Sequence, residues 1–299
     1  MSSQAPSQLT SGLLLAAFGA VAFSGKAIIV KLAYRHGVDA VTLLMLRMLF
    51  ALPFFLLMAW WAGRGQAALT RQDVLGIVGL GFVGYYLSSY LDFIGLAYIS
   101  ASLERLILYL NPTLVLFMGW WVYKRPITLR QLLAMAISYS GVLLVFAHEL
   151  NWTGEHVWLG AGLVFSSAAT YAVYMTYSGQ LVQRLGSMRL AGWASTAACA
   201  FCIAQFALLR PWGLDTVAPP VLYLSMFNAV ACTVLPVLLV MMAIERIGPA
   251  LTSQTGMVGP MSTLFMGVLV LDEPFNGWII AGTVLVLSGV FWVTRPVRG

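Results

Sequence analysis

The sequence predicts an all-α integral membrane protein with ten transmembrane helices arranged as two inverted five-helix repeats. Three observations support this fold class. The composition is too apolar for a surface in water, ten apolar windows are long enough to cross a bilayer, and landmark residues recur at one constant spacing between the two halves of the chain.

The composition places much of the surface in lipid. Of the 299 residues, 61% are hydrophobic and only 9% are charged, and the mean hydropathy is +0.89. A water-soluble domain carries about 25% charged residues. The low charged fraction therefore predicts a lipid bilayer as the environment. A net charge of +6 could indicate a nucleic-acid partner in a soluble protein, but in a membrane protein its distribution is more informative, and no nucleic acid is expected as a partner.

Ten apolar windows are close to the ~20 residues that a spanning helix requires. Helices are predicted because a barrel would show short alternating strands. Residues 1–11 contain no Lys or Arg, so they do not predict a cleaved signal peptide. The expected helices cover residues 12–34, 40–62, 73–95, 99–122, 128–147, 158–181, 189–209, 220–243, 249–271 and 276–294.

The positive charges between the windows predict the topology. With the N-terminus inside, ten Lys and Arg residues fall in inner segments, against only Lys31, Arg35 and Arg210 in outer ones. Cytoplasmic segments carry the excess of positive charge. Both termini are therefore predicted to be cytoplasmic.

Landmark residues recur 148 residues apart. The matches are Gly12 with Gly160, Pro112 with Pro260, Gly119 with Gly267, Pro126 with Pro274, and Gly141-Val142 with Gly289-Val290. They predict two five-helix repeats, residues 1–148 and 149–299. Because five is odd, the second repeat is expected to be inverted, an arrangement that places a binding site near the membrane midplane. Chance recurrence among 28 glycines is the alternative.

Charged residues within the expected helices are candidate functional groups, because a charge at membrane depth is unfavourable and is retained where it pairs or lines water. Lys26 lies near the middle of the first helix and is a candidate substrate-binding residue. Arg47, Asp92, Glu104 and Arg105 lie nearer the outer face and are interpreted as gating or structural charges. Lys26 with Asp92 and Arg47 with Glu104 are the expected pairs. Glu104 is alternatively a carrier of a coupling proton.

Aromatic and amide side chains are candidate lining residues for a cavity. Aromatic walls with a few polar groups suit a small organic substrate that has an apolar side chain. Packing or anchoring at the membrane interface is the alternative for each tyrosine. With Lys26, the candidate substrate-binding residues are Tyr85, Tyr86, Tyr90, Tyr109, Asn111, Tyr171, Tyr174, Asn228 and Gln254.

Signatures of an enzyme are absent from the sequence. The three cysteines, Cys199, Cys202 and Cys232, fall within expected helices, which is typical of buried apolar use. The three histidines are scattered, and no Walker-type phosphate loop occurs. We therefore expect no catalytic residue, no cofactor and no metal.

Two stretches carry a family resemblance. Residues 97–103 leading to Asn111-Pro112, and residues 247–250 leading to Gly259-Pro260 and then Asp272-Glu273-Pro274, resemble the EamA-type transporters of the drug/metabolite transporter superfamily. The resemblance covers essentially the whole chain and is strongest to the YddG-type aromatic amino acid exporters. The first half departs from the pattern, with Lys124-Arg125-Pro126 in place of a Glu-Pro pair.

The resemblance implies a secondary transporter that exports amino acids, including aromatic ones, and related small metabolites by alternating access. It implies a bacterial-type inner membrane. The internal repeat supplies a complete cavity within one chain, so a monomer is the expected functional unit. Alternatives are export of drugs, exchange of phosphorylated sugars or transport of other metabolites within the same superfamily, and a membrane scaffold that transports nothing.

Overall fold

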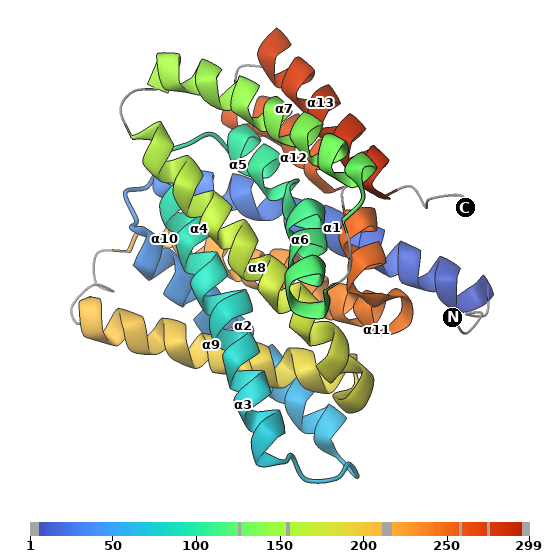
Figure 1. Cartoon of the computed structure of the whole chain (residues 1–299). Helices are drawn as coiled ribbons and strands as arrows, with labels where there is room; N and C mark the ends of the chain where they lie inside the picture. The colour runs from blue at the N-terminus through green and yellow to red at the C-terminus, as the bar shows by residue number, and fades with distance from the viewer. Residues whose placement is uncertain are drawn as a thin grey trace.

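The computed structural model describes residues 6–124, 127–153, 156–210, 217–256, 259–273 and 276–294, and this part of the chain is all-helical, without a strand (Figure 1). Two short segments, η1 and η2, are π-helical. The elements are α1 (Pro6–Tyr34), α2 (Ala40–Gly63), α3 (Arg71–Leu80), η1 (Gly81–Leu87), α4 (Ser88–Leu96), α5 (Ala101–Leu108), α6 (Asn111–Tyr123), α7 (Leu129–Thr153), α8 (Val157–Leu185), α9 (Ser187–Leu209), α10 (Pro219–Ala229), η2 (Val230–Val234), α11 (Leu235–Thr255), α12 (Gly259–Leu271) and α13 (Gly277–Thr294).

Eight helical segments of the described chain are long and apolar enough to cross a membrane, so this is a multi-pass membrane protein. A shorter apolar helix covers Gly277–Gly289. The total of ten spans and the cytoplasmic termini stay predictions. The eight segments are Gln8–Tyr34, Ala40–Gly63, Arg71–Leu96, Ala101–Val122, Leu129–His148, Val157–Leu185, Ser187–Leu209 and Pro219–Pro249.

Prolines and glycines break helices that hydropathy alone predicts as continuous. The expected helix 99–122 is divided, because α5 ends at Leu108 and α6 begins at Asn111 with Pro112 in its first turn, where the missing N–H is harmless. Gly248, inside α11, has φ 78° and ψ 165°. Such a positive φ is accessible to glycine at little strain, and it separates the windows expected at 220–243 and 249–271.

The helix bounds repeat at the spacing found in the sequence. α3 begins at residue 71 and α10 at 219, α6 spans 111–123 and α12 spans 259–271, and α7 begins at 129 and α13 at 277. Even the π-helical segments correspond, since η1 covers 81–87 and η2 covers 230–234. The bounds fit the predicted repeat, while its inversion in the membrane stays a prediction.

Packing between the halves is reciprocal. α1 packs against α11, and its counterpart α8 packs against α4. Equivalent helices also meet: α2 contacts α9, and α7 lies beside α13 along one edge of the bundle (Figure 1). Small residues permit the closest approach. A Cβ atom added at Gly141 of α7 would lie 2.6 Å from the carbonyl oxygen of Gly282 in α13.

Loops gather at two ends of the bundle, which we name by the residues that cap helices there. At the Asp39 end, the Asp39 carboxylate accepts hydrogen bonds from the backbone N–H groups of Val41 (3.0 Å) and Thr42 (3.2 Å) and begins α2. At the Thr70 end, Thr70 and Asp73 form a reciprocal capping box that begins α3. The predicted topology places the Asp39 end outside.

Candidate functional site

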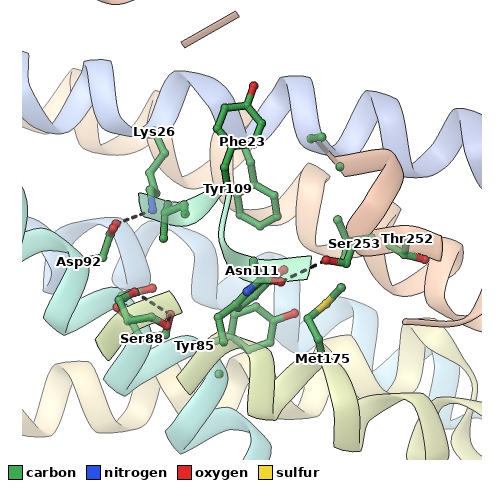
Figure 2. Close-up of a pocket in the computed structure, with 18 of the residues that line it drawn as sticks. Phe23, Lys26, Tyr85, Ser88, Asp92, Tyr109, Asn111, Met175, Thr252 and Ser253 are labelled. Carbon is green, nitrogen blue, oxygen red and sulfur yellow. Dashed lines mark hydrogen bonds and ion pairs between the residues drawn. The ribbon is translucent and has the colours of Figure 1, made fainter. Parts of the chain in front are cut away.

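A cavity of about 190 Å³, which we call the chamber, lies between the two halves of the chain. Residues of α1, α2, η1, α4, α5, α6, α8 and α11 line it. Figure 2 shows Lys26 and Asp92 facing each other at one side, and Thr252, Ser253 and Met175 at the other. The chamber is therefore charged at one side and neutral at the other.

Four charged side chains form a linked cluster at the charged side. Lys26 Nζ lies 2.5 Å from Asp92 Oδ2 and 3.7 Å from Glu104 Oε1, and Arg105 Nε lies 3.1 Å from Glu104 Oε2. Glu104 is fully buried behind the lining. The Lys26–Asp92 pair is the one expected from the sequence. Lys26 also lines the chamber, so pairing and contact with a substrate are compatible.

Arg47 of α2 lines the same side, and the expected pair with Glu104 is wrong. Lys26 and Arg105 occupy the Glu104 carboxylate. The Arg47 guanidinium instead lies over the face of Phe93, with Cζ 4.6 Å from the ring centre. Among the residues that the structure describes, Arg47 forms no ion pair, and its Nε and Nη2 atoms have no hydrogen-bond partner.

Three of the expected tyrosines, Tyr85, Tyr109 and Tyr171, line the chamber. Tyr174 is fully buried behind them and is absent from the lining. Its hydroxyl is hydrogen-bonded to that of Tyr85, and the two rings lie 4.7 Å apart. Tyr171 stacks on Tyr174 at 5.5 Å. Tyr174 therefore holds the aromatic wall in place.

Asn111 connects three helices beside the chamber, which it lines. Its Nδ2 donates to the carbonyl oxygen of Ala168 in α8 (3.3 Å), and its Oδ1 accepts from Ser253 Oγ in α11 (3.2 Å). The helix break before α6 places Asn111 at a helix start, where its side chain is directed across the chamber (Figure 2).

Three other predicted residues do not join this lining. Tyr86 and Tyr90 stack on each other at 6.2 Å, and Tyr86 also contacts Phe201 of α9. Asn228 is fully buried in α10, away from the lining residues. The side chain of Gln254 falls outside the part of the chain that is described.

Several lining residues were not predicted as site residues from the sequence. They are Phe23, Met175, Thr252 and Ser253. The repeat contained a signal for some of them. Phe23 and Tyr171, Asp92 and Val240, and Arg105 and Ser253 are each 148 residues apart, and all six line the chamber.

At the Asp39 end, one carboxylate connects the two halves above the chamber. Glu273 Oε1 accepts from the backbone N–H of Ala101 (2.7 Å), and Oε2 accepts from the N–H (3.1 Å) and the hydroxyl (2.5 Å) of Ser102. The carboxylate thus caps the N-terminus of α5, where negative charge is favourable. Arg35 Nη2 donates to the carbonyl oxygen of Leu271 beside it (2.9 Å).

No group of three or more His, Cys, Asp or Glu side chains capable of holding a metal ion occurs among the residues described. All three cysteines are buried and free. The described lining residues of the chamber offer charged, hydroxyl, amide and aromatic groups to a ligand.

Comparison with known proteins gives one consistent family match. The model of the EamA-like transporter family matches residues 10–147 and again residues 158–295. A Bacillus subtilis (strain 168) protein named uncharacterized transporter YcbK is 31% identical over 296 residues, covering 96% of this chain and 92% of that protein. An uncharacterized transporter of Archaeoglobus fulgidus is 23% identical over 285 residues, covering 94% and 96%.

One solved crystal structure has a closely similar fold. It aligns with a TM-score of 0.71 at 15% identity and covers 97% of this chain and 98% of that chain. At this identity the likeness concerns the fold alone.

Proposed function

Because the chain belongs to the EamA-like transporter family, we propose that it is a secondary transporter that exports amino acids, aromatic ones among them, and related small metabolites by alternating access. Transport of small molecules across a membrane follows from the family and from the transporters that resemble the chain. Our proposal adds three points to this: the substrate class, the outward direction of transport and the location in a bacterial-type inner membrane.

The observation that carries the substrate class is the composition of the chamber wall. Ion-paired and free charges lie at one side, and Tyr85, Tyr171 and Met175 lie along the rest. A zwitterionic head group with an apolar side chain requires both kinds of surface. Such a wall tolerates several side chains, because one methylene group changes binding by only ~1–3 kcal/mol.

The size and charge of the chamber rank the alternatives lower. A volume of about 190 Å³ is below the roughly 300–1,000 Å³ of pockets for drug-sized ligands. A sugar phosphate carries about two negative charges at neutral pH. Lys26 and Arg105 already contact carboxylates, which leaves too little positive charge for such a group.

Alternating access is supported by the position of the chamber between two halves that pack reciprocally. Contacts across the Asp39 end include those of Glu273 with α5 and of Arg35 with Leu271. On the predicted topology, this end faces outward, and its opening would release substrate outside. The chamber is built by one chain, so a monomer suffices.

The test is counterflow of labelled amino acids in liposomes that contain the purified protein, with Tyr171→Ala in parallel. We expect saturable flux of phenylalanine and leucine that Tyr171→Ala weakens. If larger cationic drugs are transported and amino acids are not, the proposed substrate class is wrong and drugs replace amino acids. Absence of flux for every small metabolite, from protein that is folded and correctly inserted, would favour a scaffold.

A further inference from the structure

We propose that Arg47 binds the carboxylate of the transported substrate, so that the chamber selects molecules with a carboxylate next to an ammonium group. This inference rests on the proposed function, because it specifies which part of an amino acid the chamber recognises. Arg47 lies on α2, two turns from the Asp39 end, and is only 2% exposed.

Two buried nitrogen atoms of Arg47 have no polar partner in the described structure, and this is the first step of the argument. Its Nε and Nη2 atoms have no hydrogen-bond partner among the described residues, although buried polar groups are satisfied in the great majority of cases. The Phe93 ring under the guanidinium gives a cation–π contact but accepts no N–H hydrogen bond in the plane of the fork. Nε and Nη2 of a residue that lines the chamber are therefore left without a polar partner in the described structure.

Charge balance around the chamber is the second step. Asp92 and Glu104 contact Lys26 and Arg105, so two carboxylates compensate two cations. Arg47 is the additional cation among the described lining residues. A single carboxylate on the substrate neutralises it, and a guanidinium fork binds a carboxylate in bidentate geometry.

The third step concerns the ammonium group of the same substrate. Asp92 uses Oδ2 for Lys26, and its carboxyl group also lies beside that of Glu104. Asp92 and Arg47 line the same chamber. A guanidinium group and a carboxylate that line one cavity match the two charged ends of a zwitterionic head group.

The experiment compares matched compounds that differ only in the head group. Wild-type protein in liposomes is loaded with labelled phenylalanine, and efflux is driven by external phenylalanine, its methyl ester, phenethylamine or phenylpropionate. We expect exchange with phenylalanine at least about 30-fold more efficient, as kcat/KM, than with the ester or the amine, the ratio typical of a lost buried charge pair.

Variants locate that selectivity. Arg47→Gln should remove most of the preference for phenylalanine over phenethylamine, and Arg47→Lys should retain part of it, because the cation remains without the fork. Arg64→Gln is the matched control, since Arg64 also lies over an aromatic ring, that of Trp60 at 3.5 Å, but does not line the chamber. It should leave the preference unchanged.

The outcomes separate this inference from the proposed function. If wild-type protein exchanges the ester or the amine as well as phenylalanine, carboxylate recognition is overturned while transport stands. The elution profile and the unfolding midpoint show whether Arg47→Gln is folded. If the folded variant keeps the wild-type preference, the claim that Arg47 recognises the carboxylate is overturned. If no compound is exchanged, the amino acid proposal fails and this inference with it.

Discussion

Replacing Glu273 by Gln tests how strongly the Asp39 end is held closed. The carboxylate accepts three hydrogen bonds from Ala101 and Ser102. A hydrogen bond to a charged group contributes about 1.5–3 kcal/mol. Gln keeps one acceptor oxygen, but its NH2 group faces donors at the other position. Because Glu273 is partly exposed, we expect Glu273→Gln to remove about 2–3 kcal/mol of the free energy that holds this end closed. This is near the value of one hydrogen bond to a charged group.

If this contact exists only in the conformation closed at the Asp39 end, that loss shifts the conformational equilibrium by about 30- to 150-fold. The assay is labelling of a cysteine at position 89, which lines the chamber, in a background where Cys199, Cys202 and Cys232 are alanine. A membrane-impermeant maleimide is added on the side that carries residue 273. Labelling should accelerate by the same factor.

Asp272→Asn in the same background is the matched control. Asp272 is the neighbouring acid, and its φ of 58° is a conformation that Asn tolerates. It should leave the labelling rate within about twofold, a few tenths of a kcal/mol. Equal rates for Glu273→Gln and wild type would refute a closing role for the carboxylate.

Three further changes follow from the contacts described. Lys26→Met should destabilise the protein by about 3–5 kcal/mol, because it leaves the buried carboxylate of Asp92 unpaired. The double variant with Asp92→Asn should recover part of that loss. Unfolding midpoints in detergent measure both effects. Gly84→Ala should lower the free energy of unfolding by about 1–3 kcal/mol, because the added Cβ overpacks against a buried tyrosine of α8. Gly79→Ala has nothing within 4 Å of its added Cβ and should leave the unfolding midpoint unchanged. Burial raises the pKa of Asp39, but hydrogen bonds from residues 41 and 42 outweigh this effect and hold its pKa below the ordinary 3.8. The ionised Asp39 therefore contributes fully to stability above pH 3.8, and this contribution is lost as the pH falls through the lower pKa of the folded state. Asp39→Asn should reduce the fall in unfolding midpoint that acid causes.

The helical architecture was largely predictable because hydropathy and the positions of Pro and Gly act locally. Hydropathy alone predicted residues 99–122 and 249–271 as single helices, but Pro112 and Pro260 are local signals for the helix starts at Asn111 and Gly259. The π-helical segments have no such local signal. A π-helix depends on packing and adds a residue per turn, so the seven residues 81–87 carry no periodic signal that distinguishes them from an α-helix.

The candidate site was partly predictable, because residue type identifies chemistry but not direction. Tyr85 and Tyr86 are adjacent, and successive residues of a helix point about 100° apart. Only Tyr85 lines the chamber. Likewise, the sequence predicted the depth of Arg47 in the membrane. It could not predict that Arg47 lacks an acidic partner, because this depends on how Lys26 and Arg105 surround Glu104.

The cap formed by Glu273 has a consequence for the energetics of a transport cycle. This cap joins Glu273 to Ala101, and the residues 148 positions away from these two are Arg125 and Pro249. Arginine has no acceptor and proline has no backbone N–H, so the repeat cannot form the equivalent contact at the Thr70 end.

If the carrier alternates, other contacts between the halves must hold the Thr70 end closed. In the described structure, Arg184 pairs with Asp73 there, and Arg189 Nη2 donates to the carbonyl oxygen of Ala67 (2.8 Å). The free energies that close the two ends would then come from different interactions.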